Sequence, residues 1–192
     1  MIHGLLFFIL LLPSVCQAVG EPSQLVKSES KVVVMAIQGQ ISKRVLESVR
    51  ESIGQVKGDP IPAGLIVLLD SSGGDGVAAM KIGRLLRKAN AHVFVTGQCA
   101  SACIFVLASG VVRGAPAYSV GIHKGRITMS DANAKIIKEV DVNEDPKAQK
   151  MLQDFEHDAS LYLAEMGMPS DLFRAMQAHQ LKGVYRLSGR EV

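Results

Sequence analysis

The residues best suited to chemistry lie in two segments that each follow an apolar, strand-like run. Ser101 comes after Gly97-Gln98-Cys99-Ala100 and opens an apolar segment of helical pattern. A hydroxyl there lies near backbone N–H groups and the positive end of the helix dipole, which stabilise a developing oxyanion. Gly73 and Gly74 let a backbone N–H approach the same point, because glycine has no Cβ. Taken singly, Ser101 is also explained as a helix cap, and the glycine pair as a tight or phosphate-binding turn.

Cys99 and Cys103 stand on either side of Ser101. In an exported protein, an even pair of cysteines is interpreted first as a disulfide. Residues four apart on a helical turn lie about 6 Å from each other, inside the range that a disulfide accepts. A bond across so short a loop stabilises by only about 2 kcal/mol, so its expected role is to shape the local turn. Two small buried apolar side chains are the alternative. No metal site is predicted, because no further cysteine or nearby histidine completes one.

Strand-like and helical patterns alternate along most of the chain. Such alternation predicts parallel β-α-β crossovers, and therefore an α/β fold whose mostly parallel sheet is flanked by helices. Ligands of such folds bind beyond the carboxyl ends of the strands, where Ser101 and the glycine pair are found. The expected strands are 31–41, 64–70, 91–96 and 115–123, and the expected helices are 43–56, 77–89, 101–109, a helical stretch within 130–167, and 170–179.

The amino-terminal segment is typical of a signal peptide. Gly4 to Pro13 is apolar and covers about half of the roughly 20 residues that span a bilayer. The small-residue cleavage pattern Cys16-Gln17-Ala18 follows it. We therefore expect a signal peptide over 1–18, a polar linker over 19–30 and a single domain over 31–192. The protein is then periplasmic or secreted, and an uncleaved signal that anchors it to the membrane is the alternative.

The composition suits a globular protein. Of the 192 residues, 48% are hydrophobic, which is enough for a buried core. The 21 Lys and Arg residues are nearly balanced by 18 Asp and Glu, and the formal charge of +3 is spread along the chain without a basic block. The chain has no Trp and few other aromatic residues on which bases would stack. Nucleic acid is therefore not an expected partner.

Three segments, taken in order, resemble a known family. LLDSSGGDGVAAMKIGRLLR, GQCASACIFVLASG and SVGIHKG are similar to the proteolytic subunit of Clp protease and its relatives in the ClpP/crotonase fold. The resemblance extends from about residue 31 to residue 124. It implies that Ser101 is the nucleophile and His123 its general base. It also implies an oxyanion hole formed by the N–H of Gly73 or Gly74 together with that of Ala102.

The acid that orients the histidine in this family has no clear counterpart in the chain. The matching stretch over 182–188 contains no carboxylate. Asp171 has about the family's separation from His123, but at the start of a helix it is more simply a capping or dipole residue. A Ser/His dyad, a carboxylate such as Asp154 or Asp158, and an inactive relative all stay open.

These features together predict an exported serine hydrolase. We expect a peptidase that acts on peptides or unfolded chains through Ser101 and His123 and needs no cofactor. An ATP-driven unfoldase is not an expected partner, because a compartment outside the cytoplasmic membrane has no ATP supply. The resemblance implies a homo-oligomer, with the helical segment Leu152 to Leu163 as the contact unless that helix covers its own sheet.

Two other classes of function compete with this prediction. A crotonase-type enzyme acting on acyl-thioesters uses paired carboxylates beside its Gly-Gly turn, and the turn from Gln98 to Ser101 has no acid near it in the sequence. A non-catalytic binding or scaffold protein would keep the fold without a complete triad. Fold alone does not choose among the three classes.

Overall fold

The computed structural model describes residues 32–56, 64–131, 136–179 and 183–189. The predicted signal peptide over 1–18 and linker over 19–30 lie outside these ranges, so both stay predictions. No helix within the described ranges is long and apolar enough to cross a membrane.

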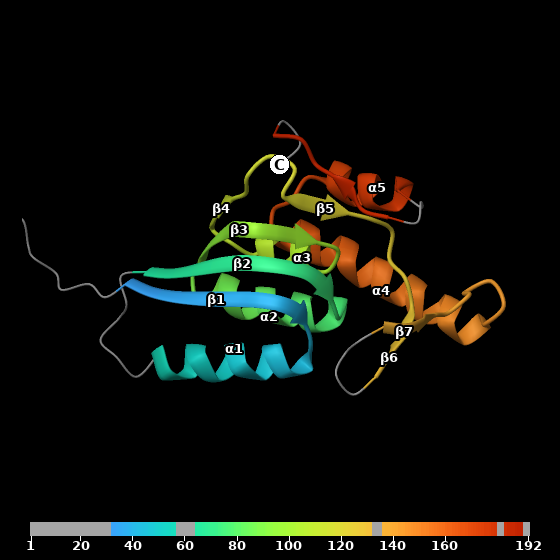
Figure 1. Ribbon diagram of the computed structural model, residues 1–192, viewed down its shortest axis with the longest axis horizontal. Coiled ribbons are helices and arrows are strands. Elements are labelled where there is room, and N and C mark those ends of the chain that lie inside the picture. Colours follow the sequence, from blue (N-terminus) through green and yellow to red (C-terminus); the bar gives the residue numbers. More distant parts are fainter. Residues whose placement is uncertain (1–31, 57–63, 132–135, 180–182, 190–192) are drawn as a thin grey trace, which may run out of the picture.

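The main sheet is mostly parallel, as the alternating pattern predicted. Its strands are β1 (Val32–Ile41), β2 (Gly64–Gly74), β3 (His92–Ala100), β4 (Val112–Gly114), β5 (Val120–Ile122) and β8 (Tyr185–Arg186). They follow the order β1-β2-β3-β5-β8, with β4 paired to the first part of β3. Only β8 is antiparallel to its neighbour, β5. The arrowheads of β1, β2, β3 and β5 point to the same side (Figure 1), so the carboxyl ends of these strands form one edge.

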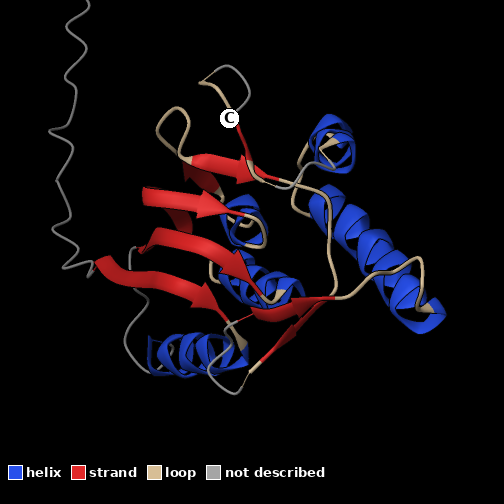
Figure 2. Cartoon of the chain, turned by 45° about the vertical axis from the view of Figure 1, so that its right-hand side comes forward, coloured by secondary structure: helices blue, strands red, loops and turns tan. Residues whose placement is uncertain are grey.

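The helices cover one face of this sheet and the region beyond its carboxyl edge. They are α1 (Lys43–Val56), α2 (Gly76–Lys88), α3 (Cys103–Ala108), α4 (Pro146–Glu165) and α5 (Ser170–Ala178). Figure 2 shows the first three in a layer against the sheet, with α4 and α5 on the side to which the parallel strands point. The apolar stripe of α1 explains its placement, because Leu46, Val49 and Ile53 are buried while the rest of the helix is mostly exposed.

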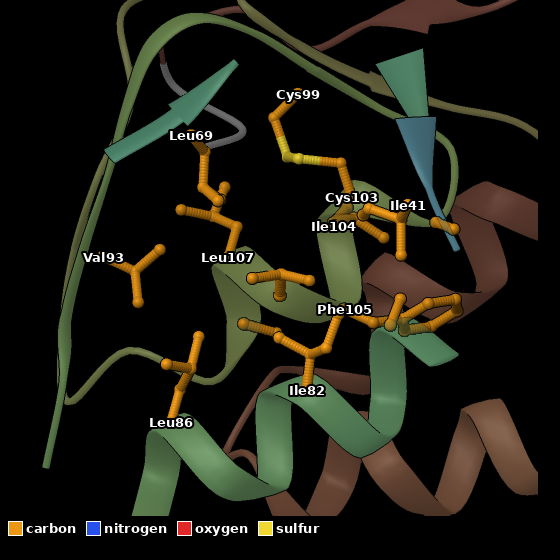
Figure 3. Packing of buried hydrophobic residues seen from close by; sticks show 14 of the residues in the cluster. Ile41, Leu69, Ile82, Leu86, Val93, Cys99, Cys103, Ile104, Phe105 and Leu107 are labelled. Carbon is orange, nitrogen blue, oxygen red and sulfur yellow. A yellow bond between two sulfur atoms is a disulfide. The ribbon is translucent and has the colours of Figure 1, made fainter. Parts of the chain in front are cut away.

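The core lies between the sheet and this helical layer. Every residue of α3 is buried, as expected for a helix that is apolar on all sides. Figure 3 shows Leu69 and Val93 of the strands in one cluster with Ile82 and Leu86 of α2 and Phe105 of α3. This packing fixes α3 at the end of β3, and therefore fixes the turn between them.

The apolar face of α4 is buried within the chain. Leu152, Ala159, Tyr162 and Leu163 all pack inside. The Tyr162 hydroxyl donates a hydrogen bond of 2.6 Å to the carbonyl oxygen of Phe105, and the two rings meet edge to face at 5.8 Å. The alternative that this helix covers its own core therefore holds for these residues. A contact between copies through the rest of the segment stays a prediction.

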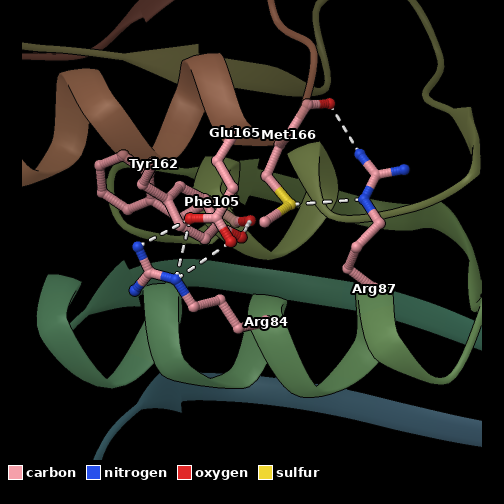
Figure 4. A network of polar contacts seen from close by, with 6 residues as sticks. All are labelled: Arg84, Arg87, Phe105, Tyr162, Glu165 and Met166. Carbon is pink, nitrogen blue, oxygen red and sulfur yellow. Dashed lines mark hydrogen bonds and ion pairs between the residues drawn. The ribbon is translucent and has the colours of Figure 1, made fainter.

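Two arginines of α2 reach toward the end of α4 (Figure 4). Arg84 lies over the ring of Tyr162 and pairs with Glu165 at 2.9 Å. Arg87 donates a hydrogen bond of 2.7 Å to the carbonyl oxygen of Met166, just past the end of α4. The last carbonyl groups of a helix have no intrahelical partner, so this guanidinium satisfies one of them.

Part of the region predicted as helical is a hairpin. β6 (Thr128–Ser130) and β7 (Ile136–Glu139) pair antiparallel, and Figure 1 shows them set apart from the main sheet. The helix begins only at Pro146, where the side chain of Asp145 caps it by accepting from two backbone N–H groups. The strand predicted over 115–123 is likewise shorter, since only Val120–Ile122 is paired. Helical periodicity downstream of residue 146 masked the short β-branched run of β7.

Candidate active site

The candidate site lies where β2 and β3 continue past their predicted ends. The segments Ser71–Gly74 and Gly97–Ala100 were predicted as turns, but both are strand. After a register shift, Ser71 pairs with Cys99, and the two glycines pair with the end of β1. The extension brings the glycine segment against the turn that follows β3.

Ser101 occupies that turn in a backbone conformation unusual for a side chain with a Cβ. Its φ is +55°, in the left-handed region. Its N–H donates to the carbonyl oxygen of Gly121 at 2.9 Å, and its own carbonyl accepts from Ile104 at 3.1 Å. The expectation that Ser101 opens a helix is wrong, because α3 begins at Cys103. The alternative that Ser101 is a helix cap is also wrong, because Ala102 occupies the cap position. A strained serine at a sharp strand-to-helix turn is also how α/β-hydrolases expose their nucleophile.

Gly73 lies directly against Ser101. A Cβ on Gly73, whose φ is +103°, would lie 2.6 Å from the Ser101 Cβ and 3.0 Å from the Ala102 nitrogen. Its N–H donates to the buried Ser71 hydroxyl at 3.1 Å. Gly74 faces the other way, since a Cβ there would meet the backbone of Ile41 in β1. Of the predicted oxyanion donors, the structure therefore brings Gly73 and Ala102 to Ser101 and leaves Gly74 apart.

His123 follows β5 directly and so lies at the same edge. Ala100 pairs with Gly121 across β3 and β5, and neighbouring strands are about 4.8 Å apart, so the residues after them are close. No hydrogen bond joins the Ser101 hydroxyl to His123 in the described part of the chain. The half-buried ring instead has its Nδ1 2.6 Å from the carbonyl oxygen of Lys124.

Burial is the main influence on the charge of His123. It lowers the pKa of the imidazole below the usual 6.5, with a further lowering by Arg126. The hydrogen bond with the Lys124 carbonyl, which is the second-largest influence, and the charge of Glu139, which is the smallest, both raise this pKa. His123 is therefore favoured in its neutral form, which is the form that accepts a proton.

The acids considered from the sequence lie away from His123. Asp171, at the start of α5, pairs with Arg174 and is 76% exposed. Asp154 pairs with Lys150 at 3.1 Å on the exposed side of α4. Asp158 lines a separate cavity between α2 and α4.

A carboxylate that the sequence did not single out lies nearer. Glu139 of β7 lines a cavity of about 190 Å³ together with His123 and Lys124, and it pairs with Arg126 at 3.3 Å. His179 also lines this cavity. Neither Glu139 nor His179 belongs to a sequence motif, and the hairpin that contains Glu139 was predicted as helix. The sequence therefore offered no signal that these two residues lie in one cavity with His123.

The disulfide is present, and it spans the turn of Ser101. Cys99 is the penultimate residue of β3 and Cys103 the first of α3, with their Cα atoms 5.2 Å apart and both side chains buried (Figure 3). The predicted bond is confirmed, but its geometry is not that of one helical turn. It closes the corner between a strand and a helix, with Ser101 at the apex.

Comparison with known proteins identifies the fold. No protein-family model matches the chain, and no curated protein does. Among solved structures, a mutant of ClpP1 from Listeria monocytogenes is 17% identical, with a TM-score of 0.61 over 82% of this chain and 84% of that one. A mutant of the 1510-N membrane-bound stomatin-specific protease is 19% identical, with a TM-score of 0.59 over 85% of this chain and 75% of that one. At these identities the likeness concerns the fold, and the chain has the fold of the ClpP-type peptidases.

Proposed function

We propose that the protein is an exported serine hydrolase, a peptidase that cleaves peptides or unfolded chains through Ser101 and His123. The observation that carries this proposal is the conformation of Ser101. A left-handed serine is held at the apex of a disulfide-closed turn, with Gly73 against it and the Ala102 N–H beside it. Strained backbone of this kind clusters at functional sites.

The chemistry follows from the groups around that serine. His123 accepts the proton as the Ser101 oxygen forms a bond to the substrate carbonyl carbon. The resulting oxyanion is stabilised by the Ala102 N–H, and such a donor contributes roughly 3 kcal/mol to lowering the barrier. The amide bond then breaks, the amine leaves with the proton from His123, and water hydrolyses the acyl-enzyme. Catalytic hydrogen bonds are often long before substrate binds, so the lack of a hydrogen bond between the Ser101 and His123 side chains in the described part of the chain is compatible with this role.

Peptide substrates are supported by the two structural neighbours, of which one is a ClpP1 and the other is named a stomatin-specific protease. Export is supported by the signal-like residues 1–18 and by the disulfide, because disulfides persist in oxidising compartments. A compartment without ATP has no energy source for an unfoldase, so the protein would act without an ATPase partner. A homo-oligomer also belongs to this proposal, through a surface other than the buried face of α4.

Two features favour a non-catalytic scaffold as the second candidate: the absent Ser101–His123 hydrogen bond and the lack of a carboxylate on His123 within the described residues. The acids near the glycine turn do not support the crotonase-type alternative, which needs paired carboxylates there. Asp70 and Asp75, the acids nearest the glycine turn, both accept backbone N–H groups, from Gln98 and from the first turn of α2. They are already engaged in holding the fold.

A fluorophosphonate probe tests the proposal. The full chain, purified after export, should be labelled, and Ser101→Ala and His123→Ala should abolish labelling. Ser72→Ala is the matched control, because Ser72 is exposed on the neighbouring strand end and should keep full labelling. An unlabelled protein with native circular dichroism would refute the peptidase and leave the scaffold.

A further inference from the structure

The ring of His123 is oriented by the main chain. Its Nδ1 lies 2.6 Å from the carbonyl oxygen of Lys124, and a carbonyl oxygen only accepts hydrogen bonds. Nδ1 must therefore carry the hydrogen of the neutral ring. The lone pair is then on Nε2, and this is the tautomer that a general base toward Ser101 requires.

The residue that supplies this carbonyl is itself fixed. The Lys124 N–H donates to the carbonyl oxygen of His179 at 3.1 Å, just past the end of α5. The His179 ring is stacked on Tyr185 at 4.1 Å, with an angle of 6° between the ring planes. Tyr185 in turn pairs with Ile122 of β5, the residue before His123. Lys124 is thus linked through His179 and Tyr185 to Ile122, and Lys124 and Ile122 are the two chain neighbours of His123.

The acids that could orient His123 are each paired with a basic side chain, and the acceptor at Nδ1 is the Lys124 carbonyl. Glu139 is engaged with Arg126, Asp171 with Arg174, and Asp154 with Lys150. No carboxylate within the described ranges accepts a hydrogen bond from the His123 ring. A carboxylate that orients a histidine must reach Nδ1 directly, and Nδ1 is already taken.

We propose that the main-chain carbonyl of Lys124 orients His123 in the position that a carboxylate fills in a Ser-His-Asp triad, and that His179 and Tyr185 are positioning residues for it. This inference rests on the proposed hydrolase function for its catalytic meaning. It answers the question that the sequence left open, since the third group is not a side chain.

The tautomer of His123 gives a test that needs no activity. In full-length protein labelled with 15N in the histidine rings, two-bond 1H–15N couplings report which ring nitrogen carries the hydrogen, and His123→Asn assigns the signal. At mildly alkaline pH we expect His123 to be neutral with its hydrogen on Nδ1. A hydrogen on Nε2 would overturn the proposal, even if the fluorophosphonate probe labels Ser101. If the probe does not label the protein but His123 carries its hydrogen on Nδ1, the proposed hydrolase function is refuted, and the orientation of His123 by the Lys124 carbonyl is supported.

Substituting the acids and measuring the rate of probe labelling tests whether one of them orients His123. Asp171→Asn, Asp154→Asn and Glu139→Gln should each change the rate of probe labelling by no more than about fivefold, as expected for exposed charges. Removing the charge of a true triad acid costs about 10⁴-fold. A loss above a hundredfold in any of the three variants would identify that carboxylate as the orienting group and refute the proposal.

Substitutions of His179 test whether His179 and Tyr185 position Lys124. His179→Ala should slow labelling by about tenfold and shift His123 toward a mixture of tautomers, because a small misplacement of a catalytic group is costly. His179→Phe, which keeps a flat ring against Tyr185, should restore both the labelling rate and the Nδ1 tautomer. If His179→Ala leaves the tautomer unchanged, or His179→Phe fails to restore it, the pair does not position Lys124.

Discussion

Replacing Gly73 by alanine tests whether this glycine positions the nucleophile. The new Cβ would lie 2.6 Å from the Ser101 Cβ and 2.7 Å from the Ala100 carbonyl oxygen. Carbon atoms in ordinary contact are about 3.5–4.0 Å apart, so the Ser101 turn must move by about 1 Å. A displacement of that size at a catalytic group costs about 10²-fold in rate. We therefore expect Gly73→Ala to slow fluorophosphonate labelling about a hundredfold.

The same substitution should also destabilise the fold. A left-handed alanine costs about 1–2 kcal/mol, and the overpacked contact adds about 1–3 kcal/mol. Gly39→Ala is the matched control, because Gly39 has φ +74° with nothing within 4 Å of the added Cβ. In urea unfolding, the free energy of unfolding of Gly39→Ala should fall by only the about 1–2 kcal/mol of a left-handed alanine, and the labelling rate should be unchanged. Equal losses of stability and equal labelling in the two variants would refute the contact between Gly73 and the serine turn.

Three further expectations follow from the site and the core. Replacing both Cys99 and Cys103 by alanine should lower the free energy of unfolding by about 2 kcal/mol and slow labelling, because the corner that carries the serine is no longer closed. Tyr162→Phe should cost about 1–3 kcal/mol in urea unfolding, since it leaves a buried carbonyl of α3 without its donor. Labelling should rise with pH through the pKa of His123, because only the neutral imidazole accepts a proton, and the midpoint should fall below the usual 6.5 since burial lowers this pKa.

Each of these expectations has a control. A reductant should slow labelling of the parent and have no effect on the double cysteine variant; equal sensitivity would mean that the disulfide is not responsible. Tyr118→Phe, at a side chain that is 64% exposed, should change stability by less than about 0.5 kcal/mol. For the pH profile, the charged and titratable groups facing His123 are Lys124, Arg126, Glu139 and His179. A midpoint above 6.5 in the parent would show that a negative charge, and not burial, dominates at His123.

Elements with a strong apolar period were predictable from the sequence. The helix predicted over 43–56 has the same bounds in the structure, because its apolar stripe is long and Ser42 precedes it as a cap, accepting from the Val45 N–H at 3.4 Å. The parallel sheet followed from the alternation of strands and helices. β7 has only four residues, and β8 only two, so neither carried enough pattern to compete with the surrounding polar sequence.

The ends of β2 and β3 were not predictable, for a physical reason. Glycine and serine at 71–74 and 97–101 favour a turn when local propensity alone is considered. The strands continue because neighbouring parallel strands offer partners, with Ser71 against Cys99 and Gly73 against Gln40. Long-range pairing therefore overrides local preference at the place where the candidate site forms.

Side-chain chemistry marked Ser101 and His123 in the sequence, but the group that orients the histidine was not visible there. A main-chain carbonyl exists at every position, so no residue type signals its use. Only the direction of the Lys124 carbonyl, fixed through His179, distinguishes it. The family pattern predicts an acid side chain near residue 171, whereas the group at Nδ1 of His123 is a backbone carbonyl.

Ser101→Gly separates catalysis from folding at the turn itself. Relieving the left-handed φ should gain about 1–2 kcal/mol, and the greater freedom of glycine in the unfolded chain should return about 0.5–1 kcal/mol. The hydroxyl accepts and donates no hydrogen bond in the described part of the chain, so its loss should not destabilise the fold. We expect Ser101→Gly to be as stable as the parent or up to about 1.5 kcal/mol more stable in urea, while labelling disappears. A loss of stability would mean that the hydroxyl holds the turn, and Ser101 would then be a structural residue of a scaffold.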